Sequence, residues 1–390
     1  MARRQRPSPI QRILAFYGKD LKGEDIQRLF TRDTRDAYRF FARDIDQDAL
    51  ARLPFPKRQW VHASLFMRAV LLRLSPARRV LYGVALGCGL VGVIQLFNGF
   101  FMARGQLFPT AQVSVPLPSF APGTGFLLWS LLLTNLLLIL ELADRLSLKN
   151  DLEIAREIQR AMLPTGTYAA AGLEAYGLTR PANTVGGDFY DILPRPDGRL
   201  IVALGDVAGK GSPAALLMAL LLAMLRTLVD EGLEDAALIA RLNAQICRHS
   251  PPSRFITLFF AIVEPATGRL TYVNAGHLPG LVRRASGGVE RLLGGGMALG
   301  MFESATYARF ETTLSPGDLL VLYSDGITEA ESPAGQPFEE SGLQGVIDGA
   351  ASSEAAALGG LVFKAVERHV QDSKLADDLT ILLLRRTAAV

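Results

Sequence analysis

Four short segments place an aspartate beside glycine or at the expected end of a β-strand. They are residues 185–191 (VGGDFYD), 205–211 (GDVAGKG), 322–326 (LYSDG) and 376–379 (ADDL). Glycine leaves room around a carboxylate, and a strand end can project a side chain into a shared cleft. Clustered carboxylates repel one another unless a cation lies among them, and Mg²⁺ and Mn²⁺ select oxygen ligands. The pattern therefore predicts a site for two metal ions.

Each motif also has a simpler interpretation, because Asp-Gly is a common turn dipeptide and aspartate often caps a helix. That alternative stays open for any single motif. Segment 205–211, which precedes a predicted helix, also resembles a phosphate-binding loop. Serine follows Gly211 instead of Lys210, however, so the GxxxxGK[ST] spacing is not met. The spacing therefore argues against nucleotide binding.

The elements that must position these aspartates begin near Thr165, where short β-rich runs alternate with amphipathic helices. The predicted strands are 200–204, 255–263, 270–274, 318–323 and 379–384, and the predicted helices are 212–231, 234–249 and 354–370. Turn sequences at 265–268 (PATG) and 286–288 (SGG) join neighbouring strands as hairpins, which favours antiparallel pairing. We predict an α+β domain over 165–390, a two-sheet β-sandwich flanked by helices.

The chain as a whole is more apolar than a typical soluble enzyme, and its N-terminal part is more basic. The hydrophobic fraction is 49%, and residues 1 to 80 hold 18 Lys/Arg against 8 Asp/Glu. The basic residues alternate with acidic ones and lead into a hydrophobic stretch, which favours a membrane surface over nucleic acid. The two cysteines, Cys88 and Cys247, are too few for a disulfide scaffold and fit a reducing cytoplasm.

Two uncharged stretches predict transmembrane helices. Residues 80–103 are long enough to form one helix across a bilayer. Residues 105–140 begin with a Pro/Gly/Ser-rich loop and become densely apolar from residue 126 onward. A buried helical hairpin in a soluble protein is the alternative. Flanking cations predict a multi-pass inner-membrane protein with both termini cytoplasmic. These cations are Arg68, Arg73, Arg78 and Arg79 before the first helix, Arg145 and Lys149 after the second, and only Arg104 in between.

The predicted division of the chain is a basic, cytoplasmic helical region over 1–78, a membrane hairpin over 79–141 and a linker helix over 142–164. Within the first region, residues 23–41 have the apolar spacing of an amphipathic helix that covers the cytoplasmic end of the hairpin. A sensor or lipid-contact helix is the alternative. No sensory ligand can be assigned to this region.

The linker helix carries apolar residues at the spacing of a coiled-coil seam. They are Leu148, Leu152, Ala155, Ile158 and Met162, and Pro164 then ends the helix. We predict a signalling helix that pairs with its counterpart in a homodimer. A spacer helix packed on its own domain is the alternative.

Taken together and in order, the motifs resemble the PPM family of metal-dependent protein serine/threonine phosphatases, in its SpoIIE-like and RsbU-like bacterial branch. The resemblance covers roughly residues 150 to 387. It is carried by six segments: 157–164 (EIQRAMLP), 180–191 (RPANTVGGDFYD), 205–215 (GDVAGKGSPAA), 274–277 (NAGH), 323–330 (YSDGITEA) and 377–380 (DDLT).

The resemblance implies a PPM fold with two Mn²⁺ or Mg²⁺ ions in a cleft at one edge of the sandwich. Asp206 matches the aspartate that bridges both ions, and the backbone carbonyl of Val207 matches a further ligand. Asp325 and Asp377 match ligands of one ion, and Asp188 matches the ligand of the other. Asp188 and Asp206 are thereby predicted to hold the nucleophilic water.

The implied reaction is attack of a metal-activated water on a phosphoserine or phosphothreonine, without a covalent intermediate. In this branch the substrate is typically a STAS-domain anti-sigma factor antagonist. A catalytically inactive binding module and a hydrolase of small phosphate esters are the alternatives. Many relatives hold the phosphate with an arginine just before the first metal ligand, where this chain has Thr184 and Val185. Arg180, somewhat earlier, is the candidate phosphate contact.

Two further residues have open roles. His277 could be a general acid or a structural hydrogen-bonding residue, and the latter is commoner for a single histidine in such a segment. Glu329 could approach the cleft or be an ordinary solvated carboxylate.

Overall fold

The computed structural model describes residues 54, 57, 61, 64–65, 71, 74–98, 100–108, 111–118, 121–251, 253–350, 354–371 and 373–387. The amphipathic helix predicted over 23–41 and most of the basic region over 1–78 lie outside these residues. The chain divides into two compact units, Met1–Arg145 and Leu146–Val390, which are described separately.

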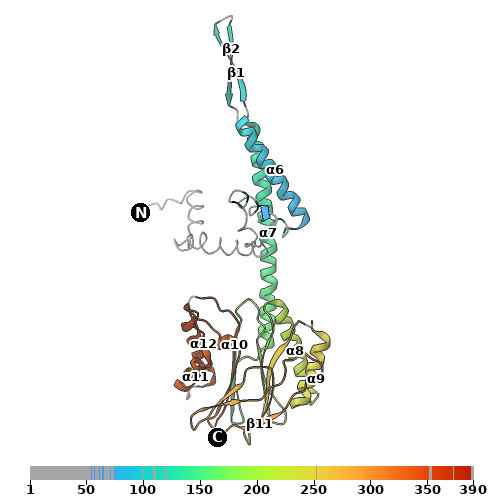
Figure 1. Cartoon of the computed structure of the whole chain (residues 1–390), viewed down its shortest axis with the longest axis vertical. Helices are drawn as coiled ribbons and strands as arrows, with labels where there is room; N and C mark the ends of the chain where they lie inside the picture. The colour runs from blue at the N-terminus through green and yellow to red at the C-terminus, as the bar shows by residue number, and fades with distance from the viewer. Residues whose placement is uncertain are drawn as a thin grey trace, which may run out of the picture. The chain divides into compact units, whose positions relative to one another are not determined.

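The N-terminal unit contains helix α6 (Pro76–Asn98), strands β1 (Phe100–Phe108) and β2 (Ala111–Pro118), and the first part of helix α7 (Ala121–Met162). The two strands pair antiparallel. A helix through residue 103 and a Pro/Gly/Ser-rich loop after it were expected here, and both expectations are wrong. Helix α6 ends at Asn98, because the Asn-Gly sequence at 98–99 is a common helix stop, and a β-hairpin follows (Figure 1).

Helices α6 and α7 present apolar surface outward. Val80 and Phe97 are 68% and 76% exposed, and Leu138 is 66% exposed. The two helices approach closely, since a Cβ at Gly123 would lie 2.5 Å from the carbonyl oxygen of Gly92. Small residues permit such contact between membrane helices. Stretches of α6 and α7 (Pro76–Phe97 and Gly123–Met162) are long and apolar enough to span a bilayer.

A third helix, α8 (Ser212–Asp230), also has the length and composition of a membrane span. Its packing differs from that of α6 and α7, because Met218, Leu221 and Leu225 are fully buried in the hydrophobic core of the C-terminal unit. Helix α8 is therefore a core helix of a folded domain.

Helix α7 continues without a break through the predicted linker and ends at Met162, just before Pro164. The seam residues differ in their exposure to solvent. Leu148 and Ile158 are 62% and 59% exposed. Met162 instead packs against the hydrophobic core of the C-terminal unit. Exposed positions therefore remain on the helix for a partner, while its last turn belongs to the domain.

The C-terminal unit is built on two antiparallel sheets. The six-stranded sheet has the order β10-β9-β12-β13-β4-β3 and the five-stranded sheet the order β11-β8-β7-β6-β5. The strands are β3 (Tyr168–Ala170), β4 (Leu173–Arg180), β5 (Phe189–Pro194), β6 (Leu200–Val207), β7 (Ile256–Val263), β8 (Arg269–Ala275), β9 (Gly280–Arg283), β10 (Val289–Leu292), β11 (Phe310–Thr313), β12 (Leu319–Tyr323) and β13 (Leu379–Arg386).

Successive side chains of a strand point to opposite faces, and here both faces are apolar. On β12, Leu320 and Leu322 join the core between the sheets, whereas Val321 joins a second core on the outer face. Burial on both faces explains why these strands are continuous hydrophobic runs in the sequence. The α+β two-sheet prediction is confirmed.

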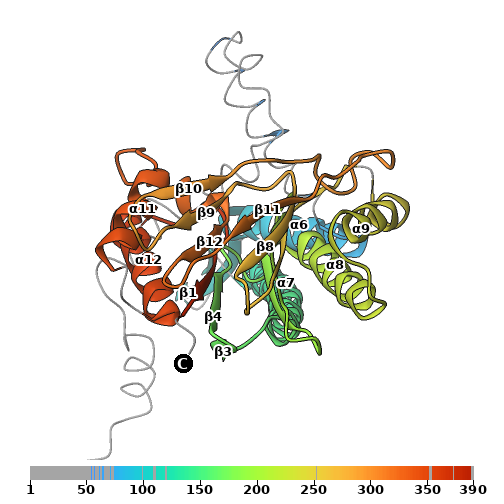
Figure 2. The same ribbon diagram turned by 90° about the horizontal axis from the view of Figure 1, so that it is seen from below.

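Helices cover the outer face of each sheet (Figure 2). α8 and α9 (Asp235–His249) contact strands of the five-stranded sheet, and α12 (Ala355–Val370) contacts β4 and β13 of the other. α11 (Glu339–Gly349) packs beside α12, and the short α10 (Asp325–Thr328) follows β12. Ends of strands from both sheets meet at one edge of the sandwich, and the aspartates lie at these strand ends or directly beside them.

Candidate active site

The predicted metal-binding aspartates lie at related ends of four strands. Asp188 directly precedes β5, and Asp206 is the penultimate residue of β6 in the same sheet. Asp325 begins α10 just after β12, and Asp377 lies two residues before β13 in the other sheet. The charges of Asp325 and Asp377 both act on Asp206. The fold thus brings together side chains from both sheets that are up to 189 positions apart in the sequence.

Burial and mutual repulsion raise the pKa values of these carboxyl groups. Burial, together with the nearby charges of Asp325 and Asp377, raises the pKa of Asp206 to about 6, although a hydrogen bond with Asp188 opposes the rise. Burial, and then the charge of Asp206, raises the pKa of Asp188 well above its ordinary value. The same two causes raise the pKa of Asp325, with Asp377 as the neighbouring charge. Such a cluster is stabilised either by protonation of its carboxylates or by a bound cation.

The oxygen atoms around Gly187 fit a hard cation. Oδ2 of Asp188 is buried and has no hydrogen-bond partner. A Cβ built on Gly187 would lie 2.9 Å from the carbonyl oxygen of Val207 and 3.0 Å from Oδ1 of Asp206. These donors are all oxygen, which Mg²⁺ and Mn²⁺ prefer. Within the described residues, no three His, Cys, Asp or Glu side chains are placed to hold an ion together, so binding would require side-chain adjustment.

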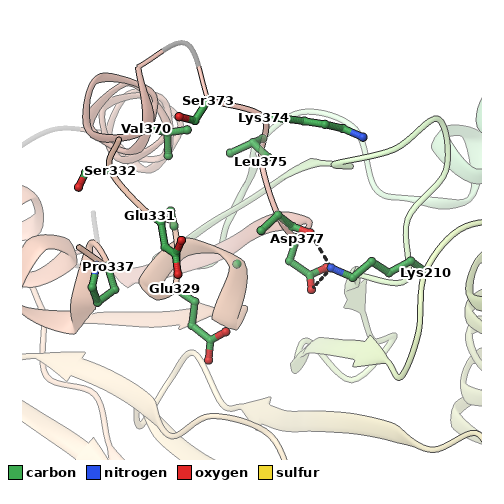
Figure 3. A pocket seen from close by; sticks show the side chains of 13 residues that line it. Lys210, Glu329, Glu331, Ser332, Pro337, Val370, Ser373, Lys374, Leu375 and Asp377 are labelled. Atoms are coloured by element: carbon green, nitrogen blue, oxygen red, sulfur yellow. Dashed lines mark hydrogen bonds and ion pairs between the residues drawn. The ribbon is translucent and has the colours of Figure 1, made fainter. Parts of the chain in front are cut away.

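A pocket of about 480 Å³ adjoins the aspartates and contains a lysine that the sequence analysis did not assign to the site. Nζ of Lys210 lies 2.8 Å from Oδ2 of Asp377 and also donates to the carbonyl of Ala376 (Figure 3). Glu329 and Lys374 line the same pocket. The sequence feature that could have placed Lys210 in the site is its position, only four residues after Asp206. Glu329 does approach the cleft, where its charge helps to raise the pKa of Asp325.

Asp378 holds the loop that carries Asp188. Its Oδ1 accepts a hydrogen bond from the amide of Ala182 and its Oδ2 one from the amide of Gly187, both at 2.7 Å. A Cβ at Gly186 would lie only 2.2 Å from Oδ2 of Asp378, so the approach depends on glycine. Both carboxylate oxygens of Asp378 are therefore occupied by backbone donors. Asp377 has partners too, since its Oδ1 accepts from the amide of Asp378 at 2.9 Å and its Oδ2 pairs with Lys210.

His277 links the two sheets beneath the aspartates. Its Nε2 lies 3.1 Å from the carbonyl oxygen of Tyr323, and its Nδ1 lies 2.9 Å from Oγ1 of Thr257. A carbonyl can only accept, so Nε2 carries the proton and the Thr257 hydroxyl donates to Nδ1. Burial lowers the pKa of His277 to about 4. This arrangement favours the structural role over that of a general acid.

Arg180 is not among the residues that line the pocket. Its guanidinium forms an ion pair with Glu367 and lies 5.5 Å from the centre of the Phe363 ring, and both partners belong to α12. A phosphate contact would require the side chain to leave these partners. The role of Arg180 stays a prediction to which this geometry adds no support.

Comparison with known proteins agrees with the fold and the motifs. The family described as stage II sporulation protein E (SpoIIE) matches residues 196–387. Phosphoserine phosphatase RsbU of Bacillus subtilis is 30% identical over 240 residues, 61% of this chain and 71% of RsbU. Protein IcfG of Synechocystis sp. is 28% identical over 263 residues, 60% of this chain but only 41% of IcfG.

Among solved structures, the SiaA-PP2C domain of Pseudomonas aeruginosa superposes with a TM-score of 0.55. It is 22% identical, and the match covers 62% of this chain and 98% of that domain, which supports a common fold. The SpoIIE match over residues 196–387 includes Asp206, Asp325 and Asp377. The chain therefore belongs to the SpoIIE/RsbU family of PP2C-type protein serine phosphatases.

Proposed function

We propose that this protein is a membrane-anchored, metal-dependent phosphatase that hydrolyses phosphoserine or phosphothreonine on a regulatory protein. The observation that carries the proposal is the group of buried oxygen atoms around Gly187, in which Asp188 has an unpartnered carboxylate oxygen. Membership of the family supports the reaction class.

Different residues of the chain would hold the metal ions, orient the water and contact the phosphate. Asp188, Asp206 and the carbonyl of Val207 would hold one ion, and Asp206, Asp325 and Asp377 the other. Bound ions would lower the pKa of a water molecule, so that it can lose a proton and attack phosphorus at neutral pH. Asp188 and Asp206 orient that water. Lys210, whose side chain is half exposed beside Asp377, offers a cation to the phosphoryl oxygens.

The substrate we propose is a phosphorylated STAS-domain regulator, because the family resemblance implies one and RsbU is itself a phosphoserine phosphatase. Purified full-length protein in detergent should release phosphate from such a substrate when Mn²⁺ is present, and the release should stop when a chelator removes the ion. In cells, the phosphoproteomes of the wild type and of Asp206→Asn should differ at the substrate serine or threonine. Release that persists in excess chelator would exclude the metal mechanism.

We also propose that α6 and α7 cross the inner membrane and that both termini are cytoplasmic. The outward apolar side chains of both helices support two spans, and Arg78 near the start of α6 pairs with Glu141 and Asp144 at 3.3 and 2.7 Å. These three charges belong together on one side of the bilayer. Reporters fused at residue 115 and at the C-terminus should give opposite signals, periplasmic and cytoplasmic. A cytoplasmic signal at residue 115 would contradict this topology.

The exposed seam positions Leu148 and Ile158 support a homodimer through the linker helix. Anchoring both chains in one membrane would raise their effective concentration and so favour a short seam. Sedimentation of the detergent-solubilised protein as a monomer at all concentrations would argue against this dimer.

A further inference from the structure

A second pocket, of about 550 Å³, lies next to the candidate active site and is called the side pocket below. Residues 183–185 form part of its wall, and Asp188 follows them in the same loop. Lys374, three residues before Asp377, borders both the side pocket and the 480 Å³ pocket that contains Lys210. A polypeptide bound with one residue at the aspartates can therefore place a nearby residue in the side pocket.

The side pocket carries positive charge. Among the described residues that line it, Arg156 and Lys374 are cationic and none is acidic. Its wall also includes Ser212 at the start of α8, where the positive end of the helix adds to the attraction for an anion. The 480 Å³ pocket differs, because carboxylates such as Glu329 and Asp377 lie beside its lysines. An acidic group is therefore favoured in the side pocket over its neighbour.

Arg156 and Lys374 both have unpaired charges. Nε of Arg156 is buried without a hydrogen-bond partner, although the side chain as a whole is only partly buried. Nζ of Lys374 lies 3.5 Å from the neutral Oδ1 of Asn183, and Figure 3 shows this amine directed away from Asp377. Within the described residues neither side chain forms an ion pair.

Unpaired cations in a pocket are suited to a carboxylate or a phosphate. A buried N–H group without a partner costs free energy, which a bound acceptor recovers. The guanidinium group presents its donors as a planar fork, which matches the two oxygens of a carboxylate or phosphate. Arg156 is therefore the stronger of the two anchors, and Lys374 adds a second positive charge at the side that faces the active site.

We propose that the side pocket is a subsite for an acidic group of the phosphoprotein substrate, a carboxylate or a second phosphate a few residues from the phosphorylated serine or threonine. Arg156 and Lys374 are then specificity-determining residues. The inference rests on the proposed function, since it names the class of substrate that the same site prefers. The reacting phosphate stays at the aspartates, so the two cations act on binding of the flanking residues and not on the chemical step.

The test uses full-length protein in detergent with Mn²⁺ and a set of phosphoserine peptides. One peptide has only neutral residues around the phosphoserine. In a first series a single aspartate replaces each nearby residue in turn, and in a second series a non-hydrolysable phosphonate does so. We expect the wild type to have a KM about tenfold lower when the acidic group occupies a particular position, with kcat unchanged. A response to the phosphonate alone would identify the group as a second phosphate.

Arg156→Gln should remove this preference, so that the ratio of kcat/KM for the acidic and the neutral peptide falls from about ten to about one. Lys374→Gln should lower the ratio by a smaller factor, because Lys374 lacks the planar fork. Arg156→Lys keeps the charge and should restore part of the preference. Arg160→Gln is the matched control, since Arg160 is exposed four residues further along α7 and does not line the side pocket. It should keep the wild-type ratio.

The ratio separates a subsite from a structural role, because a damaged fold lowers the activity toward both peptides alike. The inference would be overturned if the wild type preferred no acidic position. A wild-type ratio in folded Arg156→Gln and Lys374→Gln would overturn it as well, as would an equal loss in Arg160→Gln.

Failure of the proposed function gives a different result. A wild type that hydrolyses none of the peptides would remove that function. Fluorescence polarisation of labelled peptides bound to the same proteins would then still decide the role of the side pocket. Tighter binding of the acidic peptide that disappears in Arg156→Gln would keep the subsite, and equal binding of both peptides would exclude it.

Discussion

Replacing Asp206 with asparagine should lower phosphatase turnover by about a thousandfold or more while the protein stays folded. The charges of Asp325 and Asp377 both raise the pKa of Asp206. An oxygen of Asp206 and the carbonyl oxygen of Val207 both lie close to Gly187. Asparagine keeps the shape but removes the negative charge. Phosphate release at saturating Mn²⁺ measures the effect, and Asp348→Asn, which alters only a surface pair with Arg283, is the matched control.

The same variant should change how stability depends on pH in the metal-free protein. The pKa of Asp206 is raised from 3.8 to about 6, chiefly by burial, so the folded state binds the proton more tightly than the unfolded state. The contribution of Asp206 to stability is therefore fully present below about pH 4 and is lost as the pH rises through about 6. Asp188 and Asp325 are shifted in the same direction and add to the fall.

Thermal unfolding in chelator between pH 4 and pH 7 should accordingly show a shallower decline for Asp206→Asn than for the wild type. Mn²⁺ should stabilise the wild type most at the upper end of this range, because it replaces the missing protons. Identical pH profiles for the variant and the wild type would show that the ionised carboxylate of Asp206 does not destabilise the folded protein. Near-wild-type turnover would remove the binuclear assignment altogether.

The sandwich and the grouping of the aspartates could be predicted because their signals are local. Strand β12 is apolar on both faces, with Leu320 on one and Val321 on the other, and each aspartate adjoins a glycine or a strand end. Composition and spacing therefore suffice. The hairpin over 100–118 was missed because the uncharged stretch was read as one helix and a loop. In such a stretch apolar content alone does not distinguish strand from helix.

The contacts that organise the site could not be predicted, because their partners are backbone groups far away in the sequence. Gln159 pairs with Gly186, and Asp378 pairs with Ala182 and Gly187. Side-chain periodicity says nothing about which carbonyl or amide a polar group will meet. Lys210 was missed for a related reason, since its partner Asp377 becomes a neighbour only when β6 and β13 are placed in their two sheets.

Substituting Gly187 with alanine should weaken Mn²⁺ binding and turnover by about a hundredfold, although every carboxylate is kept. The backbone of Gly187 does not occupy the left-handed region, so alanine can adopt its conformation. The cost arises from the added methyl group, which would lie 2.9 Å from the Val207 carbonyl oxygen and 3.0 Å from Oδ1 of Asp206. A backbone oxygen cannot move aside cheaply, so the methyl group would separate the donors that must converge on an ion.

Gly360→Ala in α12 is the matched control, because a Cβ there meets no atom within 4 Å. In the interior of a helix, this change should raise stability by about 0.5–1 kcal/mol and leave Mn²⁺ affinity unchanged. Calorimetric titration of both variants with Mn²⁺ separates the two effects. Asp206→Asn removes charge at constant shape, and Gly187→Ala changes shape at constant charge. A Gly187→Ala protein that binds Mn²⁺ as tightly as the wild type would therefore place the ions away from Val207, even if Asp206 proved essential.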